Sequence, residues 1–452
     1  MKSGKNRGSA SVYMMCLLIP TVICVCMLIR YAQLVSAKGL VIDAAGLAEN
    51  AVMSAYNHPM KEAYGIFCYT KSEEEMKKLG ENYMNKSLPQ NIQGQINVQY
   101  SGATLADNAA FMNEIDSFMS KWSSVAYIET SAQTSKYCDM VTEASVIRDR
   151  IRANYNSAMT VGGISEIEIP EELSAIRENA VGCAEADTLT LAADNGSFNY
   201  SGQGNIIKAE NRKIAASQSI DTNVYAGMCM LDDVENYYTP ITAAYQSQLS
   251  QNQNYKLALY AYGNFDSFHN MGCISFTGRY YQSDEYKSVC PWGEGEFIIN
   301  SSSDYNTNWN KVKYQIYESL FAEYLVGMYD SYISDPDIND YATQLAGENT
   351  EYIPMIKDEL VIGVCANLAY SEMLKVYRYE GTCTMQSYMH YIQLFDMIEV
   401  ERDKSGVLDR VRHVMTTNAH SWTSAEAQEF GFAKARTRVD VTVGRYNVVP
   451  SF

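Results

Sequence analysis

Two glutamates in the middle of the chain, Glu294 and Glu296, are the side chains whose spacing first suggests chemistry. A pair of carboxylic acids can cleave a glycosidic bond, but glycosidases place the two acids on separate elements at a defined separation. The surrounding sequence, PWGEGEFIIN, predicts a glycine-rich turn followed by a strand over 296–300. We therefore interpret the two glutamates as charges that protect a solvated strand edge.

A second candidate is the stretch that starts at Asp335, which imitates a calcium-binding loop because oxygen-bearing side chains alternate along it. Such a loop needs glycine at its sixth position and glutamate at its twelfth, where this chain has Asp340 and Ala346. A helix start explains the same residues, with Ser334 or Asp335 as N-cap and Pro336 in the first turn. We predict a helix start.

The histidines are scattered, and none pairs with a carboxylate or a cysteine at ligand spacing. His413 and His420 are seven residues apart and could share a helix face, which we interpret as structural. The sequence has no phosphate-binding glycine loop, nucleophile elbow or zinc-protease motif. We predict no catalytic residue, no metal ligand and no cofactor.

Tyrosine is unusually frequent, with 35 residues against 13 phenylalanines and 4 tryptophans. A tyrosine ring with its hydroxyl suits protein interfaces and sugar contacts. The interpretation that we favour is that tyrosine replaces phenylalanine at half-buried positions. The candidates for a binding surface are Tyr237, Tyr238, Tyr255, Tyr260, Tyr262, Tyr280 and Tyr281.

The elements that must position these side chains begin with an apolar segment near the N-terminus. Val12 to Ile29 carries no charge, and its polar members are Tyr13 and Thr21, so it meets the length and apolarity of a membrane-spanning helix. Pro20 would kink this helix rather than end it. Three basic residues and no acid precede the segment, which predicts a cytoplasmic N-terminus and a single-pass protein of the cell membrane with its C-terminal domain extracellular.

The charge of the chain restricts its partners. It is -18 overall and -21 once the basic leader is left out. A surface of this sign repels nucleic acid, so the lipid bilayer is a predicted partner and nucleic acid is not. The hydrophobic share of 47% and charged share of 19% are ordinary for a globular protein, and the length allows one large domain or two smaller ones.

We divide the chain into a basic leader (1–8), a transmembrane helix (9–30), an extracellular extension of the same helix (31–57) and an ectodomain (58–452). The extension is expected because alanine and apolar residues recur at helical spacing after Arg30, with no proline before Pro59. This continuation is amphipathic, so its apolar side must pack on another element, and His58-Pro59 would close it.

The ectodomain is predicted to be mostly helical with a small mixed or antiparallel sheet, an α+β fold. Strand patterns occur at 64–70, 96–105, 296–300 and 433–449, and we expect the last to join the early ones. Helical patterns occur at 73–83, 108–158 with a break near Thr130, 206–262, 309–332, 361–369 and 385–420.

Glycine, asparagine and serine concentrate near 160–205, which predicts a loose region, either a long surface loop or an internal boundary. Eight cysteines outside the membrane segment permit four disulfides, although several stand in apolar helical runs where free buried thiols are the simpler interpretation. These cysteines are Cys68, Cys138, Cys183, Cys229, Cys273, Cys290, Cys365 and Cys383.

The chain begins with a basic leader that ends in glycine, followed by an apolar helix and its amphipathic continuation. The runs that carry this arrangement are GSASVYMMCLLIPTVICVCMLI and LVIDAAGLAENAVMSAYNHPMKEAYGIF. This arrangement resembles type IV pilin-like proteins, notably the TadE/TadG-like pseudopilins of the tight-adherence (Flp) pilus. The chain also looks like a family of large single-anchor proteins of Gram-positive bacteria that accompany such pilus systems. Two later stretches add to this resemblance: GEGEFIINSSSDYNTNWNKVKYQIYESLFAEYLVGMYDSY and SYMHYIQLFDMIEVERDKSGVLDRVRHVM.

The resemblance implies cleavage of the leader between Gly8 and Ser9 by a prepilin peptidase. Pilins that enter a filament usually carry glutamate at the fifth mature position, which here is Tyr13. The pairing of that carboxylate with a neighbour's amino terminus is therefore absent. An ordinary signal peptidase is the alternative, and Val35-Ser36-Ala37 could serve as its site.

We therefore expect a membrane-anchored pseudopilin or minor pilin that acts in pilus assembly or surface attachment. Its expected partners are other pilus-assembly or pseudopilin subunits and a surface protein or glycan. The competing hypothesis is a secreted or signal-anchored enzyme, or a ligand-binding ectodomain. We predict no enzyme because the sequence offers no catalytic constellation.

Overall fold

The computed structural model describes residues 7–88, 92–101, 103–120, 123–161, 220–246, 253–267, 290, 293–378, 385–422, 435–443 and 446–448. The fold is mostly helical, and the chain forms two compact units. Unit 1 comprises 1–58, 67–110 and 428–452, and unit 2 comprises 59–66 and 111–427. Unit 1 is therefore built from both ends of the chain. In the sequence, most of unit 2 lies between the second and third segments of unit 1.

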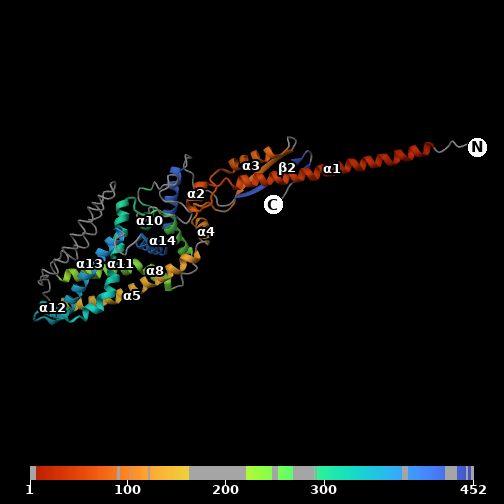
Figure 1. Ribbon diagram of the computed structural model, residues 1–452. Helices are drawn as coiled ribbons and strands as arrows, with labels where there is room; N and C mark the ends of the chain where they lie inside the picture. The colour runs from red at the N-terminus through yellow and green to blue at the C-terminus, as the bar shows by residue number, and fades with distance from the viewer. Residues whose placement is uncertain are drawn as a thin grey trace, which may run out of the picture. The chain divides into compact units, whose positions relative to one another are not determined.

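Unit 1 is organised by the helix α1 (Arg7–Met53), which is 47 residues long and contains Pro20. The helix ends at Met53, so the expected closure at His58-Pro59 is wrong by one turn. His58 instead begins the short helix α2 (His58–Tyr64), because proline is readily accommodated in a first helical turn. In Figure 1 the N-terminal part of α1 projects from the part of unit 1 that holds α3 and β2.

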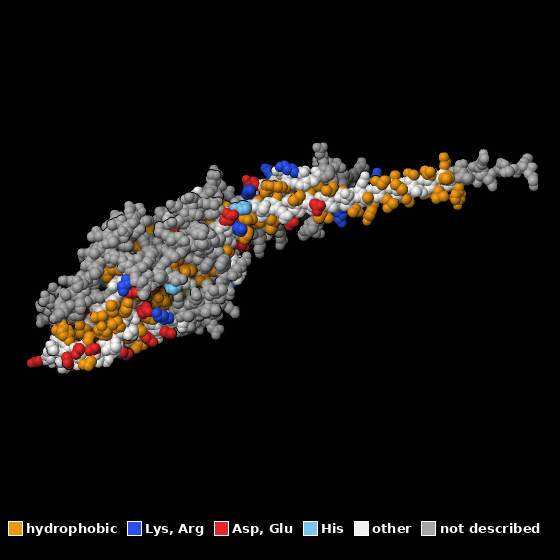
Figure 2. Space-filling view, in the orientation of Figure 1, with side chains coloured by type: hydrophobic (Ala, Val, Ile, Leu, Met, Phe, Trp, Pro, Cys, Tyr) orange, Lys and Arg blue, Asp and Glu red, His pale blue; other side chains and the backbone are white. Residues whose placement is uncertain are grey.

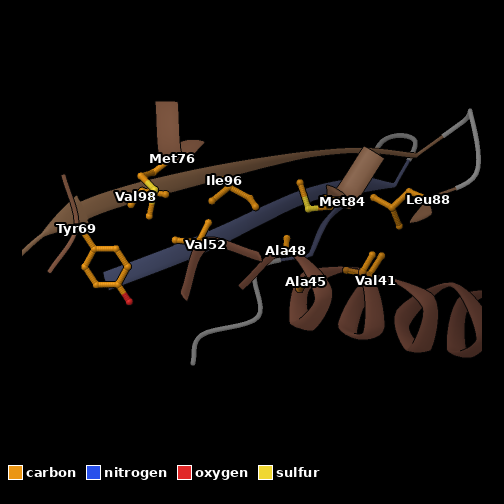
Figure 3. Close-up of a cluster of buried hydrophobic side chains, with 11 residues drawn as sticks. Val41, Ala45, Ala48, Val52, Tyr69, Met76, Met84, Leu88, Ile96 and Val98 are labelled. Carbon is orange, nitrogen blue, oxygen red and sulfur yellow. The ribbon is translucent and has the colours of Figure 1, made fainter. Parts of the chain in front are cut away.

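The C-terminal half of α1 packs on the remainder of unit 1 through a narrow face of small residues. Val41, Ala44, Ala45, Ala48 and Val52 recur at helical spacing and are buried. They contact residues from the helix α3 (Glu73–Ser87), the strand β1 (Ile92–Tyr100) and the segments beside them, as Figure 3 shows: Tyr69, Met76, Met84, Leu88, Ile96 and Val98. Alanine side chains allow a close approach here, and this cluster is the core of unit 1.

The sheet of unit 1 joins segments from opposite ends of the sequence. Strand β1 pairs antiparallel with β2 (Ala435–Val443), in a register that sets Ile92 opposite Val443 and Tyr100 opposite Ala435. Strand β2 pairs in turn with β3 (Tyr446–Val448), giving the order β1-β2-β3. The observed strand β1 starts earlier and ends earlier than the 96–105 pattern predicted.

Helix α3 is fixed at its start by a capping box. The Ser72 hydroxyl accepts a hydrogen bond from the Glu75 amide (3.3 Å), and the Glu75 carboxylate accepts one from the Ser72 amide (2.9 Å). The neighbouring Glu73 accepts from the Tyr100 amide at the end of β1 (2.8 Å). These bonds hold the start of α3 beside the sheet.

Unit 2 is a bundle of long helices. In contact are α5 with α8, α11 with α13, and α14 with α8, α9 and α10 (Figure 1). The largest side chains of its core include Trp309, Tyr317 and Phe321 of α11 and Tyr388 of α14. Its helices are α4 (Asn108–Met119), which begins in unit 1, α5 (Ser123–Val161), α8 (Ile220–Gln246), α9 (Gln253–Asn264), α10 (Glu294–Asn300), α11 (Tyr305–Ile333), α12 (Pro336–Ala346), α13 (Ile353–Arg378) and α14 (Met385–Trp422), with a 3-10 turn at Thr350–Tyr352.

The helices predicted at 309–332, 361–369 and 385–420 are confirmed as parts of α11, α13 and α14. The 206–262 pattern corresponds to α8 and α9, with 206–219 outside the described residues. The break predicted near Thr130 is wrong, because α5 is continuous from Ser123 and the interruption precedes it. The loose region near 160–205 lies almost entirely outside the described residues.

Two predicted strands are wrong. At 64–70, Tyr64 is the last residue of α2, and Gly65 takes a left-handed φ of 73° that ends the helix. The residues after it make a single bridge position at Tyr69 instead of a strand. At 296–300 the chain forms α10, because Gly293 with φ 72° turns it into a buried helical turn and tertiary burial overrides the strand propensity of Phe-Ile-Ile.

Removing residues 428–452 should unfold unit 1 and leave unit 2 folded, since β1 would lose its partner strand while the bundle of unit 2 would keep its core. All four tryptophans, Trp122, Trp292, Trp309 and Trp422, belong to unit 2, so tryptophan fluorescence monitors that unit alone. We expect an unchanged fluorescence transition in chemical unfolding and rapid proteolysis at 67–110. Loss of the fluorescence transition would contradict the independence of the two units.

Candidate functional site

The largest surface feature of unit 1 is the apolar surface of α1. Along 12–29 every side chain is exposed, and none is charged (Figure 2). A soluble protein does not leave so long an apolar stretch in water. Helix α1 is long and apolar enough to cross a membrane.

The predicted anchor residues all belong to this helix. Val12, Tyr13 and Ile29 are exposed, and Pro20 lies within the helix. The predicted cleavage site, Gly8-Ser9, lies in the first turns of α1. The structure thus places the leader junction and the apolar segment on one continuous element.

Exposed apolar side chains continue on α1 beyond Arg30, on both sides of the basic residue Lys38. On the C-terminal half of α1, Leu40 and Leu47 are seven residues apart, so they share one side of the helix, and both are exposed. The adjacent Ala48 is fully buried in the core of unit 1. The helix therefore has one face bound to its own unit and other positions that present apolar side chains outward.

The interpretation of Glu294 and Glu296 as exposed strand charges is wrong. Both belong to α10 and are buried, because α10 packs against α14. Glu294 accepts hydrogen bonds from the Asp266 amide (2.6 Å) and from the Asn418 side chain. Glu296 accepts one from the Tyr388 hydroxyl (2.7 Å). Buried carboxylates are stable only when such donors replace water.

A further buried acid, Asp396 of α14, lies near Glu296 and has no hydrogen-bond partner for either oxygen within the described part of the chain. Burial first, and then the neighbouring Glu296, raise the pKa of Asp396 well above its ordinary value, while Arg410 offsets part of this effect. The sequence analysis missed Asp396. Its setting in YIQLFDMIEV, with apolar residues on both sides, was the available signal.

A kink divides α14 just after this acid. Asp403 has non-helical φ and ψ of -148° and 71°, and its carboxylate accepts a hydrogen bond from the Gly406 amide (2.9 Å), so it caps a second helical segment. Arg410 on that segment lies 3.9 Å from both Glu399 and Asp403, and its Nε donates to the Ile298 carbonyl of α10 (2.5 Å). One guanidinium therefore links both sides of the kink to α10.

A separate buried acid, Asp358, joins three helices of unit 2. It accepts hydrogen bonds from the Tyr329 hydroxyl of α11 (2.8 Å) and the Asn154 amide of α5 (2.9 Å). Burial raises the pKa of Asp358 to about 6, although both hydrogen bonds lower it. The neighbouring Glu359 accepts from Asn223 of α8 (3.2 Å). Two consecutive acids of α13 thus hold the surrounding helices.

The remaining sequence candidates serve the fold or lie outside the described residues. Asp335 is confirmed as the N-cap of α12, accepting from the amides of Asp337 (2.8 Å) and Ile338 (3.4 Å). His413 is exposed on α14 and lies beside Phe297, with ring centroids 5.8 Å apart. The side chain of His420 is outside the described residues.

The proposed tyrosine surface is wrong for the tyrosines whose side chains the structure buries: Tyr238, Tyr255 and Tyr260. The hydroxyl of Tyr260 donates to the Tyr64 carbonyl (2.8 Å), and that of Tyr238 lies 2.6 Å from the Ser319 hydroxyl. They are core residues with a polar end, which agrees with the favoured interpretation that tyrosine takes the place of phenylalanine. Tyr280 and Tyr281 lie outside the described residues.

Of the eight outer cysteines, five are described, and all five are free thiols. Cys183, Cys273 and Cys383 are outside the described residues. The part of the chain that the structure describes holds no group of three histidine, cysteine, aspartate or glutamate side chains arranged to bind a metal ion. The candidate features of the described residues are therefore the apolar surface of α1 and the buried acids of unit 2.

Comparisons with known proteins give no relative: no family model, no curated protein and no solved structure matches the chain.

Replacing Asp358 by asparagine should remove part of the pH dependence of unit 2. The folded pKa of about 6 lies above the ordinary 3.8, so the folded state holds a proton that the unfolded state releases between these values. Stability falls as pH rises through this window, by about 3 kcal/mol in total. Chemical unfolding followed by tryptophan fluorescence should show a smaller fall in Asp358→Asn than in the wild type, because other buried acids with a raised pKa, such as Asp396, still contribute to it.

Asp330 provides the matched control, because it is an exposed acid next to Tyr329 and paired with Arg150. Asp330→Asn should keep the wild-type dependence on pH. Equal slopes in the wild type and Asp358→Asn between about pH 4 and about pH 6 would contradict the assignment.

Proposed function

We propose that this protein is a membrane-anchored, pilin-like component of a tight-adherence type IV pilus or secretion system, acting in pilus assembly or surface attachment. Its N-terminus would lie in the cytoplasm, α1 would cross the cell membrane, and unit 2 would be extracellular. The observation that carries the proposal is the construction of unit 1: one helix whose first half is an exposed apolar rod and whose second half packs on a small helix and an antiparallel sheet.

The two halves of α1 support different parts of this function. The uncharged surface of 12–29 suits the hydrocarbon core of a bilayer, and the basic residues before it favour retention of the leader on the cytoplasmic side. The buried alanine face of the second half fixes the helix rigidly to its own unit. A helix held this way transmits the position of its anchor to the folded module.

Exposed apolar side chains beyond Arg30 support association with other subunits. Leu40 and Leu47 lie outside the proposed membrane span and are not covered by the core of unit 1. Contact with the apolar helices of other pseudopilin subunits would remove them from water. The resemblance of the leader and helix arrangement to TadE/TadG-like pseudopilins, and of 8–29 and 40–67 to single-anchor proteins that accompany tight-adherence pilus systems, points to subunits of this type.

An anchored enzyme or ligand-binding ectodomain is the second candidate function. The buried acids do not support this function, because the carboxylates of Glu294, Glu296 and Asp358 already accept hydrogen bonds from neighbouring parts of unit 2. A hydrolytic role would require carboxylates that face a substrate.

Processing of the leader tests the proposal most directly. A prepilin peptidase should cut between Gly8 and Ser9, removing Lys2, Lys5 and Arg7, after which the apolar helix could leave the bilayer without carrying three cations across it. Mass spectrometry of the mature N-terminus should therefore give Ser9, and Gly8→Leu should block cleavage. Gly4→Leu, in the same leader, is the matched control and should leave cleavage unchanged.

An unprocessed Met1 would contradict the pseudopilin assignment and leave only a static anchor. A mature N-terminus at Lys38 would mean release by ordinary signal peptidase, which would overturn both the pilin-like function and the anchor.

Introducing a charge on the outward side of α1 should weaken subunit association without unfolding unit 1. Leu47→Asp would place an uncompensated carboxylate in an apolar contact, so crosslinking between subunits in membranes should fall about tenfold or more. Ala48→Asp is the control: it buries the charge in the core of unit 1 and should unfold that unit instead. Undiminished crosslinking in a folded Leu47→Asp protein would remove this side of α1 from the interface.

A further inference from the structure

The strongest unassigned feature of unit 2 is the buried carboxyl group of Asp396 at the contact between α14 and α10. The side chain is 1% exposed, and neither of its oxygens receives a hydrogen bond from any described residue. An ionised carboxylate in such a place loses its hydration without replacement, which costs several kcal/mol. The neutral acid avoids this cost because it carries no charge.

The groups around Asp396 do not neutralise an additional negative charge. Helix α10 contributes the buried acid Glu296, and α8 contributes Tyr237, whose pKa burial raises. On α14 itself, Glu399 adds a further acid and Arg410 the cation that acts on Asp396. Where helix α9 meets α14, Gln253 accepts from Lys404 (3.3 Å) and Asn254 donates to Glu401 (3.2 Å).

The guanidinium of Arg410 makes one hydrogen bond within the described residues, and its buried Nη2 makes none. It donates to the carbonyl of Ile298 and lies 3.9 Å from carboxylate oxygens of Glu399 and Asp403. Two other cations also act on Glu399: Arg402, which donates a hydrogen bond to it (2.6 Å), and Lys311 of α11. Ionised Asp396 would therefore compete with Asp403 and Glu399 for the group that links the kink to α10.

The kink is the place at which this competition would change the structure. Asp403 interrupts the helix between Asp396 and Arg410, and its carboxylate holds the Gly406 amide. A side chain at position 406 would collide with that carboxylate, because an added Cβ would lie 1.9 Å from Asp403 Oδ2. The contact at the kink is thus close, and each segment of α14 donates a hydrogen bond to α10, Tyr388 to Glu296 and Arg410 to the Ile298 carbonyl.

We propose that the contact between α10 and α14 is a proton-dependent joint, closed when Asp396 is protonated and loosened at the Asp403 kink when Asp396 releases its proton. The proton is the ligand of this site. The joint lies in the unit that the proposed function places outside the cell, but the inference rests on unit 2 alone and holds whichever function the anchor serves.

Hydrogen exchange of the full-length protein tests the joint. Between about pH 7 and about pH 9, above the pKa of Asp358, protection of 294–300 and 385–402, corrected for intrinsic exchange, should fall by up to about tenfold per pH unit. Protection of α11 and α13 should stay level over the same window. Asp396→Asn, which keeps the shape of the side chain, should abolish the fall, and Glu348→Gln at an exposed position should not.

Difference infrared spectra give a second measurement. The wild type at neutral pH should show the carbonyl stretch of a protonated carboxylic acid, and Asp396→Asn should lose it. An ionised Asp396 at neutral pH would overturn the proposal, as would pH-independent protection of 385–402 in the wild type. The wild-type exchange profile decides the question even if the variant does not fold.

Discussion

The apolar face of α1 is the constraint on which unit 1 depends. One helix has to satisfy two surroundings: an uncharged exposed rod over 12–29, and a folded module packed against Val41, Ala45, Ala48 and Val52. The first half needs apolar side chains in every direction, whereas the second needs a narrow face of small residues. Because the helix is continuous through Arg30, the orientation of the rod fixes the orientation of the packed face.

Unit 2 uses a different means of holding helices together. Its apolar core contains buried acids, and several of them accept hydrogen bonds from neighbouring helices, as Asp358 does from Tyr329 and Asn154, although Asp396 accepts none within the described residues. Such bonds contribute modestly to net stability. Removing one partner, however, leaves a buried polar group with neither a hydrogen bond nor water, which costs about 1–3 kcal/mol. They therefore restrict which helix can occupy each position more than they add to the free energy of folding.

The long periodic elements could be predicted from the sequence, as could the short charged helix at 73–83, whereas α2 and α10 could not. The apolar run of 12–29 and the helical spacing around Trp309 identify α1 and α11 because their patterns persist over several turns. The Phe-Ile-Ile of α10 favours a strand locally, and only the packing against α14 makes it a helix. The same packing buries Glu294 and Glu296, so their interpretation as surface charges failed for the same reason. For Asp396 the apolar residues on both sides of it in the sequence were the one local signal of burial.

The pairing of β1 with β2 also has a consequence for the order of events during synthesis. The two strands are separated by more than three hundred residues, so the helix that leads the chain waits for a segment translated near its end. Until then β1 presents an unpaired edge, which is a site of aggregation in other proteins. A ribosome that stalls within unit 2 would leave α1 with an unfinished module, and that exposed edge would distinguish the truncated chain from the complete one for a protease.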